Sequence, residues 1–278
     1  MLAIALALGS SACYGVSNFI GPQLAKRHTI VAVLVTSQIA AMLACVAYVL
    51  ADGAAPLSAP NTAIALIAGA GNAGGLIGFY RAAELGPLSV AAPIGALGAI
   101  VPVLWGLLDG EALRATEAIG LLLAIGGGAL AARVTPAEEV TYRDPRASVL
   151  WASFSALCFG VFLTALPQAS DDGRAWSLLD ARIALVTILL LWAGVRLRAL
   201  RPGRESITLA VPGLLLVAGT LLYTVAADHG QLSIVSVLGS LFPVFTVGLA
   251  AVLLAERLSR EQAIGVTAAL AGIVLIAV

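Results

Sequence analysis

Several polar side chains stand inside long apolar stretches of the sequence, where a hydrogen-bonding group needs either a partner helix or a water-filled cavity. Asn72 lies near the centre of one such stretch, and its amide offers two donors and one acceptor to a polar solute. A hydrogen bond between two helices is the alternative use of the same amide. The other polar residues in such positions are Ser17, Asn18, Gln38, Tyr80, Arg182, Tyr223, Ser236 and Ser240.

Asparagines and tyrosines in these stretches could together hold a small solute. The asparagines would hydrogen-bond the solute, and the tyrosines would pack against it. A tyrosine near the end of an apolar stretch can instead lie at the membrane–water boundary, an alternative that is strongest for Tyr80. The substrate-binding residues that we expect are Tyr14, Ser17, Asn18, Asn72, Tyr80, Tyr223 and Ser236.

Four charged residues are candidates for gating or for coupling to an ion. Arg81 and Glu84 are three residues apart on one helical face, where they can form an ion pair. Glu84 and Asp228 both stand at the ends of apolar stretches, so solvation of a helix end is the alternative for each. Arg182 lies about one turn inside its stretch, where it can reach toward water, pair with Asp180 or a loop acid, or recognise an anion.

The sequence contains one literal match to the dinucleotide-binding pattern, at Gly69-Ala70-Gly71-Asn72-Ala73-Gly74. A real dinucleotide site needs a strand before the glycines, a helix after them and an acid about 20 residues further on. Residues 88–108 contain no acid, and the whole pattern lies inside an apolar stretch. Close packing of one helix against another through small residues therefore explains the glycines better.

Metal and cofactor chemistry has no support in the sequence. The three cysteines, Cys13, Cys45 and Cys158, all stand inside apolar runs without paired spacing. The two histidines lie in loops and show no metal-ligand spacing. We therefore expect no catalytic residues, no metal and no cofactor.

The composition says which kind of protein must position these residues. Hydrophobic residues make up 60% of the 278 residues, and charged residues make up 11%. The mean hydropathy is +1.03, whereas a soluble domain carries about 25% charged residues. The 15 basic and 15 acidic residues also cancel, so no net charge attracts nucleic acid. These values predict an integral membrane protein in contact with lipid, and they exclude a soluble enzyme and a nucleic-acid binder.

Ten apolar stretches are each close to the 20 or so residues that a helix needs to cross a bilayer. Long, solidly apolar runs favour helices, since the strands of a membrane barrel would alternate over about ten residues. The predicted fold is all-α, with ten transmembrane helices and turn dipeptides such as Asp52-Gly53 and Asp109-Gly110 between them. The predicted spans are 2–24, 30–51, 61–80, 88–108, 115–133, 148–168, 176–196, 207–227, 232–253 and 260–277.

The two halves of the chain resemble each other at an offset of about 145 residues. Tyr14-Gly15 matches Phe159-Gly160, Ile119-Gly120 matches Ile264-Gly265, and Gly127 matches Gly272. Each half holds five predicted spans, so the second half would enter the membrane inverted, as in many secondary transporters. The predicted division is a first repeat at residues 1–134, a linker at 135–147 and a second, inverted repeat at 148–278.

Basic residues mark one side of the predicted membrane arrangement. Twelve of the 15 basic residues fall in the loops or span ends after the first, third, fifth, seventh and ninth spans, beginning with Lys26-Arg27. Because positive loops stay in the cytoplasm, this count predicts that both termini lie outside.

Two stretches carry a resemblance to a known family. One is Tyr14-Gly15-Val16-Ser17-Asn18-Phe19 followed by a positive turn. The other runs from Pro243-Val244-Phe245 through Glu256-Arg257-Leu258-Ser259 to Gly265 and Gly272. With the five-plus-five organisation, the chain resembles the EamA-type permeases of the drug/metabolite transporter superfamily over essentially its whole length. The resemblance implies a permease of a bacterial plasma (inner) membrane, with a site walled by the first, third, fourth, sixth, eighth and ninth spans. Many members of the family are thought to have cytoplasmic termini, whereas the charge count favours outside.

No carboxylate lies deep within a predicted span, which disfavours proton-driven export of cations. The function that we expect is transport of a small polar metabolite, neutral or zwitterionic such as an amino acid, by alternating access. The alternatives are a membrane-embedded scaffold and a lipid-handling protein, either a flippase or an enzyme acting on a lipid-linked substrate. The sequence leaves open the solute, the direction of transport, any coupling ion, and whether the protein is a monomer or a homodimer.

Overall fold

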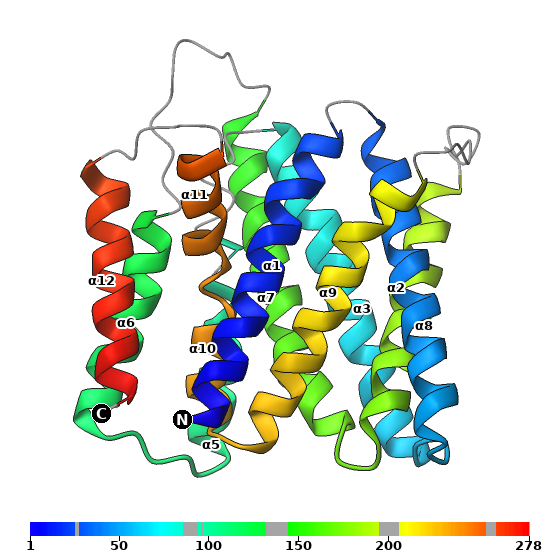
Figure 1. The fold of residues 1–278 in the computed structure, drawn as a ribbon, viewed down its shortest axis with the longest axis horizontal. Helices are drawn as coiled ribbons and strands as arrows, with labels where there is room; N and C mark the ends of the chain where they lie inside the picture. Colours follow the sequence, from blue (N-terminus) through cyan, green and yellow to red (C-terminus); the bar gives the residue numbers. More distant parts are fainter. Residues whose placement is uncertain are drawn as a thin grey trace.

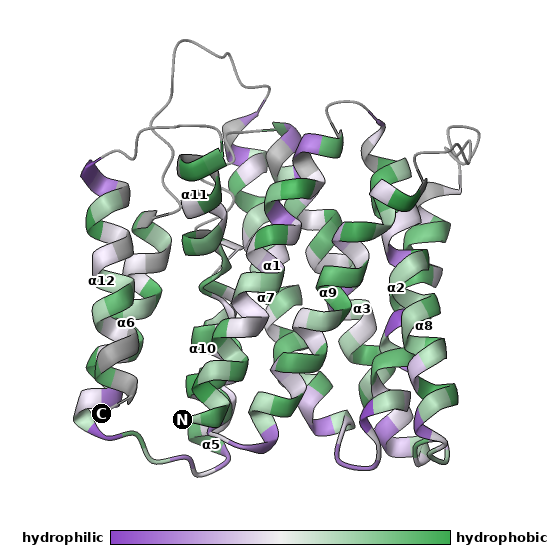
Figure 2. Cartoon of the chain, viewed as in Figure 1, coloured by the Kyte–Doolittle hydropathy of each residue, from purple (hydrophilic) through white to green (hydrophobic). Residues whose placement is uncertain are grey.

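The computed structural model describes residues 1–25, 28–85, 94–95, 97–131, 144–194, 206–253 and 260–277. Over these residues the chain is all-α, without a strand. The helices stand side by side, and the chain begins and ends at the same end of the bundle (Figure 1). Hydrophobic residues run along most of each helix, and hydrophilic residues gather near the helix ends (Figure 2). This distribution is the one expected of helices that cross a bilayer.

Six helices in the described part of the chain are long and apolar enough to cross a membrane. They are α1 (Leu2–Ala25), α2 (Ile30–Asp52), α3 (Ala59–Leu85), α7 (Pro145–Ala169), α8 (Arg174–Ala193) and α9 (Ser206–Asp228). The other elements have shorter apolar runs, namely η1 (Leu97–Ala99), α5 (Ile100–Leu108), α6 (Ala115–Ala131), α10 (Leu232–Gly239), α11 (Phe242–Leu253) and α12 (Arg260–Ala277). The six long helices match predicted spans to within a few residues.

Two predicted spans differ from the structure. The prediction of one helix over 232–253 was wrong, because the chain leaves the helix at Ser240 and Leu241, between α10 and α11. Pro243 follows this break, and a proline is tolerated in the first turn of a helix because it has no N–H to donate. In the predicted span 88–108, helical structure is described at residues 94–95, in η1 and in α5, with Pro102 in the first turn of α5.

Local sequence signals set several helix ends. The Thr29 side chain accepts a hydrogen bond from the Ala32 amide at 3.2 Å and caps α2, and Asp144 caps α7 in the same way at 3.0 Å. Gly53 closes α2 with a φ of 66°, in the left-handed region that favours glycine. Gly110, in the other predicted turn, has a φ of 93°.

Some sequence predictions lie outside the described residues. They include the positive turn Lys26-Arg27, the motif Glu256-Arg257-Leu258-Ser259 and all of the 135–147 linker before Asp144.

Helices from the first half of the chain pack mainly against helices from the second half. α3 lies along α7 and α8, α1 lies along α9, and α6 lies along α12. The glycines of α3 confirm the predicted close helix contact. A Cβ at Gly69 would overlap the Ala181 carbonyl of α8, and a Cβ at Gly71 would lie 2.8 Å from the Cys158 carbonyl of α7. The glycine pattern therefore lies within a helix and serves packing.

The contact between α6 and α12 is reciprocal. A Cβ at Gly127 would lie 2.7 Å from the Gly265 carbonyl oxygen, and a Cβ at Gly272 would lie 2.6 Å from the Gly120 carbonyl oxygen. In the sequence, Gly127 and Gly272 are 145 residues apart, and so are Gly120 and Gly265. The two helices thus approach each other through matching positions of the two halves.

Candidate substrate cavity

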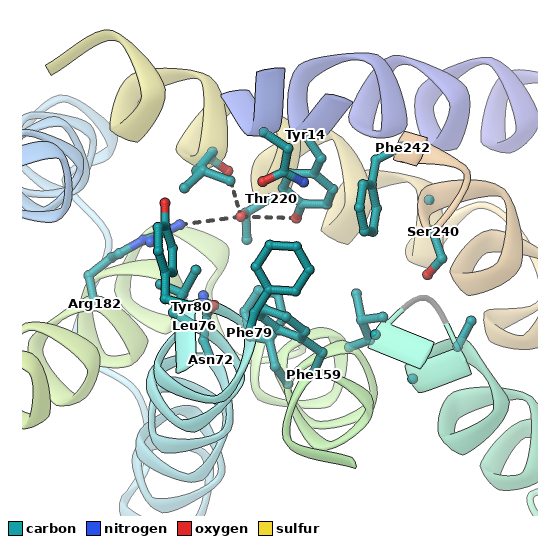
Figure 3. Close-up of a pocket in the computed structure, with 18 residues that line it drawn as sticks. Tyr14, Asn72, Leu76, Phe79, Tyr80, Phe159, Arg182, Thr220, Ser240 and Phe242 are labelled. Carbon is teal, nitrogen blue, oxygen red and sulfur yellow. Dashed lines mark hydrogen bonds between the residues drawn. The ribbon is translucent and has the colours of Figure 1, made fainter. Parts of the chain in front are cut away.

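A cavity lies near mid-length of the helices, between the two halves of the chain. It holds about 800 Å³ that no protein atom fills, counting the part that opens to solvent. Figure 3 shows its lining, which comes from α1, α3, α7, α8, α9, η1 and the junction of α10 with α11. Its polar lining is Tyr14, Asn18, Asn72, Tyr80, Arg182, Thr220 and Ser240. Its larger apolar lining is Leu76, Phe79, Phe159, Phe162, Leu163, Leu216 and Phe242.

Six of the residues singled out from the sequence meet at this cavity: Tyr14, Asn18, Asn72, Tyr80, Arg182 and Ser240. They come from α1, α3, α8 and the junction of α10 with α11, so elements that are distant in the sequence place them together. Every predicted span that the resemblance placed around the site contributes residues to the cavity lining. α8 also contributes, although its span was not among those expected.

Three other predicted binding residues are not among the cavity lining, and their hydroxyl groups bond to helix carbonyls. Ser17 Oγ donates to the Pro212 carbonyl at 3.0 Å, and Ser236 Oγ donates to the Ser233 carbonyl at 2.9 Å. Tyr223 is fully buried and donates to the Leu163 carbonyl at 2.7 Å. In this conformation Ser17 and Tyr223 each join two helices, and Ser236 bonds within its own helix, α10.

Arg182 is buried in the cavity wall, with 3% of its surface exposed. From the sequence, we considered that Arg182 could extend toward water or form an ion pair with an acid, and the structure shows neither arrangement. Its Nη1 donates to Gln38 Oε1 at 2.5 Å, and its Nη2 donates to Thr220 Oγ1 at 3.4 Å. The guanidinium group is therefore held by two neutral oxygens, one from α2 and one from α9, and it also has a hydrogen bond with the Cys45 side chain of α2.

Thr220 connects the arginine to the first helix. Its Oγ1 donates to the Leu216 carbonyl at 2.7 Å and accepts from the Tyr14 hydroxyl at 3.1 Å. Figure 3 shows Arg182 and Tyr14 reaching Thr220 from opposite sides. The sequence gave no signal for Thr220, since a threonine in an apolar helix usually bonds to its own backbone.

The two cavity asparagines keep their hydrogen-bonding capacity. Within the described residues, neither Asn18 nor Asn72 has a hydrogen bond from its side chain to the protein, and both line the cavity. The bond between helices that was the alternative for Asn72 is therefore not formed here. Both amides can donate to and accept from a solute.

The charged candidates lie away from the cavity, apart from Arg182. Arg81 Nη1 and Glu84 Oε2 are 2.8 Å apart, which confirms the predicted pairing, and both side chains are exposed. Asp228 forms an ion pair with Arg174, at the end of the bundle where α9 ends and α8 begins. A role in gating stays a prediction for all of these residues.

Several contacts join the loops at the end of the bundle where α1 begins, which we call the closed end. Glu111, in the loop between α5 and α6, accepts hydrogen bonds at the start of α10. The donors are the Leu232 amide at 2.6 Å, the Ser233 amide at 3.1 Å and the Ser233 hydroxyl at 2.5 Å. Trp176 Nε1 also donates to the Ala54 carbonyl at 2.9 Å. These contacts connect first-half and second-half loops.

Asp172 makes a similar connection between the start of α8 and the start of α3. Its carboxylate accepts hydrogen bonds from the Ser58 hydroxyl and, at 3.3 Å, from the Ser58 amide. Hydrogen bonds from the Ser58 and Asn61 side chains hold the pKa of Asp172 below its ordinary value. The ionised carboxylate is therefore the form that this contact favours.

The comparison with protein families decides the class of this protein. The family model described as the EamA-like transporter family matches residues 146–278. Residues 146–278 are an EamA-like transporter domain. The resemblance read from the sequence over essentially the whole chain is thereby confirmed for residues 146–278. Together with the apolar helices, this match to a transporter family over residues 146–278 indicates a multi-pass membrane protein.

In the comparison with solved structures, 26 chains match this protein. One of them, described as "Crystal structure of protein", has a TM-score of 0.81 and 16% sequence identity. The match covers 98% of this chain and 94% of the other. No curated protein sequence matches. The EamA-like domain thus lies within a larger known fold.

Proposed function

We propose that the protein is a permease that moves a small polar metabolite by alternating access between two inverted five-helix repeats. The observation that carries this proposal is the cavity, which lies near mid-length of the helices and combines polar groups from both halves of the chain. A solute site at the interface of two inverted repeats is typical of secondary transporters. The solute would be neutral or zwitterionic, such as an amino acid.

The packing of the helices supports the proposed repeats. The contact of α1 with α9 has its counterpart, at the sequence offset of the two halves, in the contact of α7 with α3. The reciprocal glycine contact between α6 and α12 follows the same relation. On this basis we keep ten membrane-crossing segments, divided into repeats at residues 1–134 and 148–278, as part of the proposal.

The closed end supports a cycle with two opposite states. Below the cavity, Tyr223 bonds to Leu163, and Glu111 holds the start of α10. Asn18 and Tyr80 lie further along their helices, toward the opposite end. The positive-loop count assigns the closed end to the outside of a bacterial plasma membrane. The described conformation would then face the cytoplasm.

A transport assay with matched variants tests this proposal. Purified protein is reconstituted in liposomes and offered a pool of amino acids, nucleosides and sugars, and uptake is measured by mass spectrometry. Asn72→Leu removes a cavity amide, and Gln23→Leu removes an amide near the end of α1, outside the cavity lining. We expect uptake that Asn72→Leu loses and Gln23→Leu keeps.

The other outcomes separate the alternatives. Uptake that survives Asn72→Leu would keep the permease and remove Asn72 from its site. No uptake of any solute, with or without a pH gradient, would contradict the permease and favour a lipid flippase or a scaffold. Chemical conversion of an offered compound would favour the enzyme.

A further inference from the structure

We infer that Arg182 is the binding group for a carboxylate, so that the cavity takes a solute with a carboxylate at one end and an apolar body at the other. The inference rests on the proposed function, because it names the class of solute for the same cavity. It is carried by the unbalanced charge of Arg182, by unused hydrogen-bond donors around it and by the apolar residues of the cavity.

The charge of Arg182 has no carboxylate partner among the described residues. The ionisable groups that face it are Cys45 and Tyr14, and both are neutral at pH 7 at their ordinary pKa values. Asp180 lies two residues away on α8, where a side chain points to a different face, and its hydrogen-bond partner is Thr62. A buried guanidinium group stays charged, and a buried charge is stable only when it is paired. A ligand anion would supply the missing partner.

The surroundings of Arg182 also have more donors than acceptors. The guanidinium has five N–H groups, and the structure gives them three neutral partners, on Gln38, Thr220 and Cys45. The other end of the Gln38 amide, Nε2, is buried without a hydrogen-bond partner. The amide of Asn72 adds unused donors in the cavity wall. A carboxylate, which only accepts and can bind a guanidinium through both oxygens, fits this surplus of donors.

The rest of the cavity is suited to an apolar body. Phe79, Phe159 and Phe242 lie away from Arg182 across the cavity in Figure 3. No carboxylate from the described residues lines the cavity, so an organic cation would find only neutral acceptors there. An anionic head bound to Arg182 with an apolar group against the phenylalanines uses both parts of the lining.

Binding of matched probes tests the inference without relying on transport. The probes are 3-phenylpropionate, its amide and the corresponding alcohol, which share the same body and differ in the head group. Isothermal titration calorimetry on the purified protein, with empty micelles subtracted, gives the affinities. We expect the acid to bind at least about 30-fold more tightly than the amide, since a charge-assisted pair is replaced by a neutral hydrogen bond.

Two variants identify the residue responsible. Arg182→Gln should abolish the preference for the acid, whereas Arg260→Gln, an exposed arginine at the start of α12, should keep it. If Arg182→Gln does not fold, the double variant Gln38→Leu/Arg182→Leu replaces both bonded partners with apolar side chains. A buried polar pair replaced in this way commonly leaves a fold intact. The double variant should also lose the preference.

The outcomes distinguish this inference from the proposed function. Equal affinity for acid and amide, or a preference that persists without Arg182, would overturn the inference. Uptake of other solutes into liposomes without any binding of the acid would overturn it as well, while the permease remains. Preferential binding of the acid to a protein that transports nothing would uphold the carboxylate site and overturn the permease.

Discussion

Glu111 is expected to hold the closed end together through the start of α10, and replacing it tests this directly. Its carboxylate accepts two backbone amides and one hydroxyl from Leu232 and Ser233. In Glu111→Gln one oxygen remains as an acceptor, but the charge and the second oxygen are lost. The amides at the start of α10 would then keep only part of the hydrogen bonding that Glu111 provides.

The size of the effect follows from these contacts. A negative charge at a helix start contributes about 0.5–1 kcal/mol, and a lost hydrogen bond to a charged group costs about 1.5 kcal/mol. Together they predict a loss of about 2 kcal/mol in the free energy of unfolding. For a chain of this order of size, that loss lowers the midpoint of thermal unfolding by about 4–8 °C.

Gly106 offers an independent way to disturb the same contact. A Cβ at this position would overlap the carboxylate of Glu111, so Gly106→Ala should push that side chain away from α10 without changing any charge. The double variant with Glu111→Gln should therefore be little worse than either single variant, because both remove one interaction.

The assay is thermal unfolding of the purified variants in detergent, and Glu117→Gln serves as the control. Glu117 caps only its own helix, by accepting the Arg114 amide at 2.7 Å, so its replacement should lower the midpoint by about 1–2 °C. Equal midpoints for Glu111→Gln and the native protein would refute the reasoning. Additive losses in the double variant would show that Gly106 and Glu111 act separately.

Further predictions concern packing and pH. A Cβ at Gly213 of α9 would overlap the Ser37 backbone of α2, so Gly213→Ala should cost more than about 2 kcal/mol. Gly126→Ala, where a Cβ meets nothing within 4 Å, should be neutral or slightly stabilising, and denaturant unfolding compares the two. Because the folded pKa of Asp172 is lowered, its contribution is present above its unfolded pKa and is lost as the pH falls through the folded value. Asp172→Asn should therefore be less stable than the native protein at pH 7 and equal to it at the acidic end of a titration of unfolding midpoints; a gap that stays constant with pH would contradict this.

Hydropathy was enough to predict the long helices but not their interruptions. The apolar runs of α1, α2 and α9 are as long as a helix must be to cross the bilayer core. The hydropathy of the sequence was therefore enough to locate these helices. The break at Ser240 could not be predicted in the same way. Residues 232–253 are apolar throughout, and a proline such as Pro243 is also found within unbroken membrane helices.

The candidate site was predictable where a polar side chain stood out from an apolar run. Asn72 and Arg182 were found in this way, and both line the cavity. Thr220 and Phe159 could not be found, because a threonine or a phenylalanine in a membrane helix usually serves packing. Tyr223 stood out equally, but its hydroxyl bonds to a carbonyl, and no sequence pattern distinguishes that use from binding a solute.

The reciprocal contact of α6 and α12 has a consequence for the energetics of the proposed cycle. Gly127 approaches Gly265, and its counterpart Gly272 approaches Gly120, so exchanging the roles of the two halves leaves this pair of contacts unchanged. Such a contact contributes equally to the inward-facing and outward-facing states, so it adds nothing to the free-energy difference between them. The preference for one state must then come from residues without a counterpart. Arg182, whose equivalent at the offset of 145 is Ser37, is one such source of asymmetry.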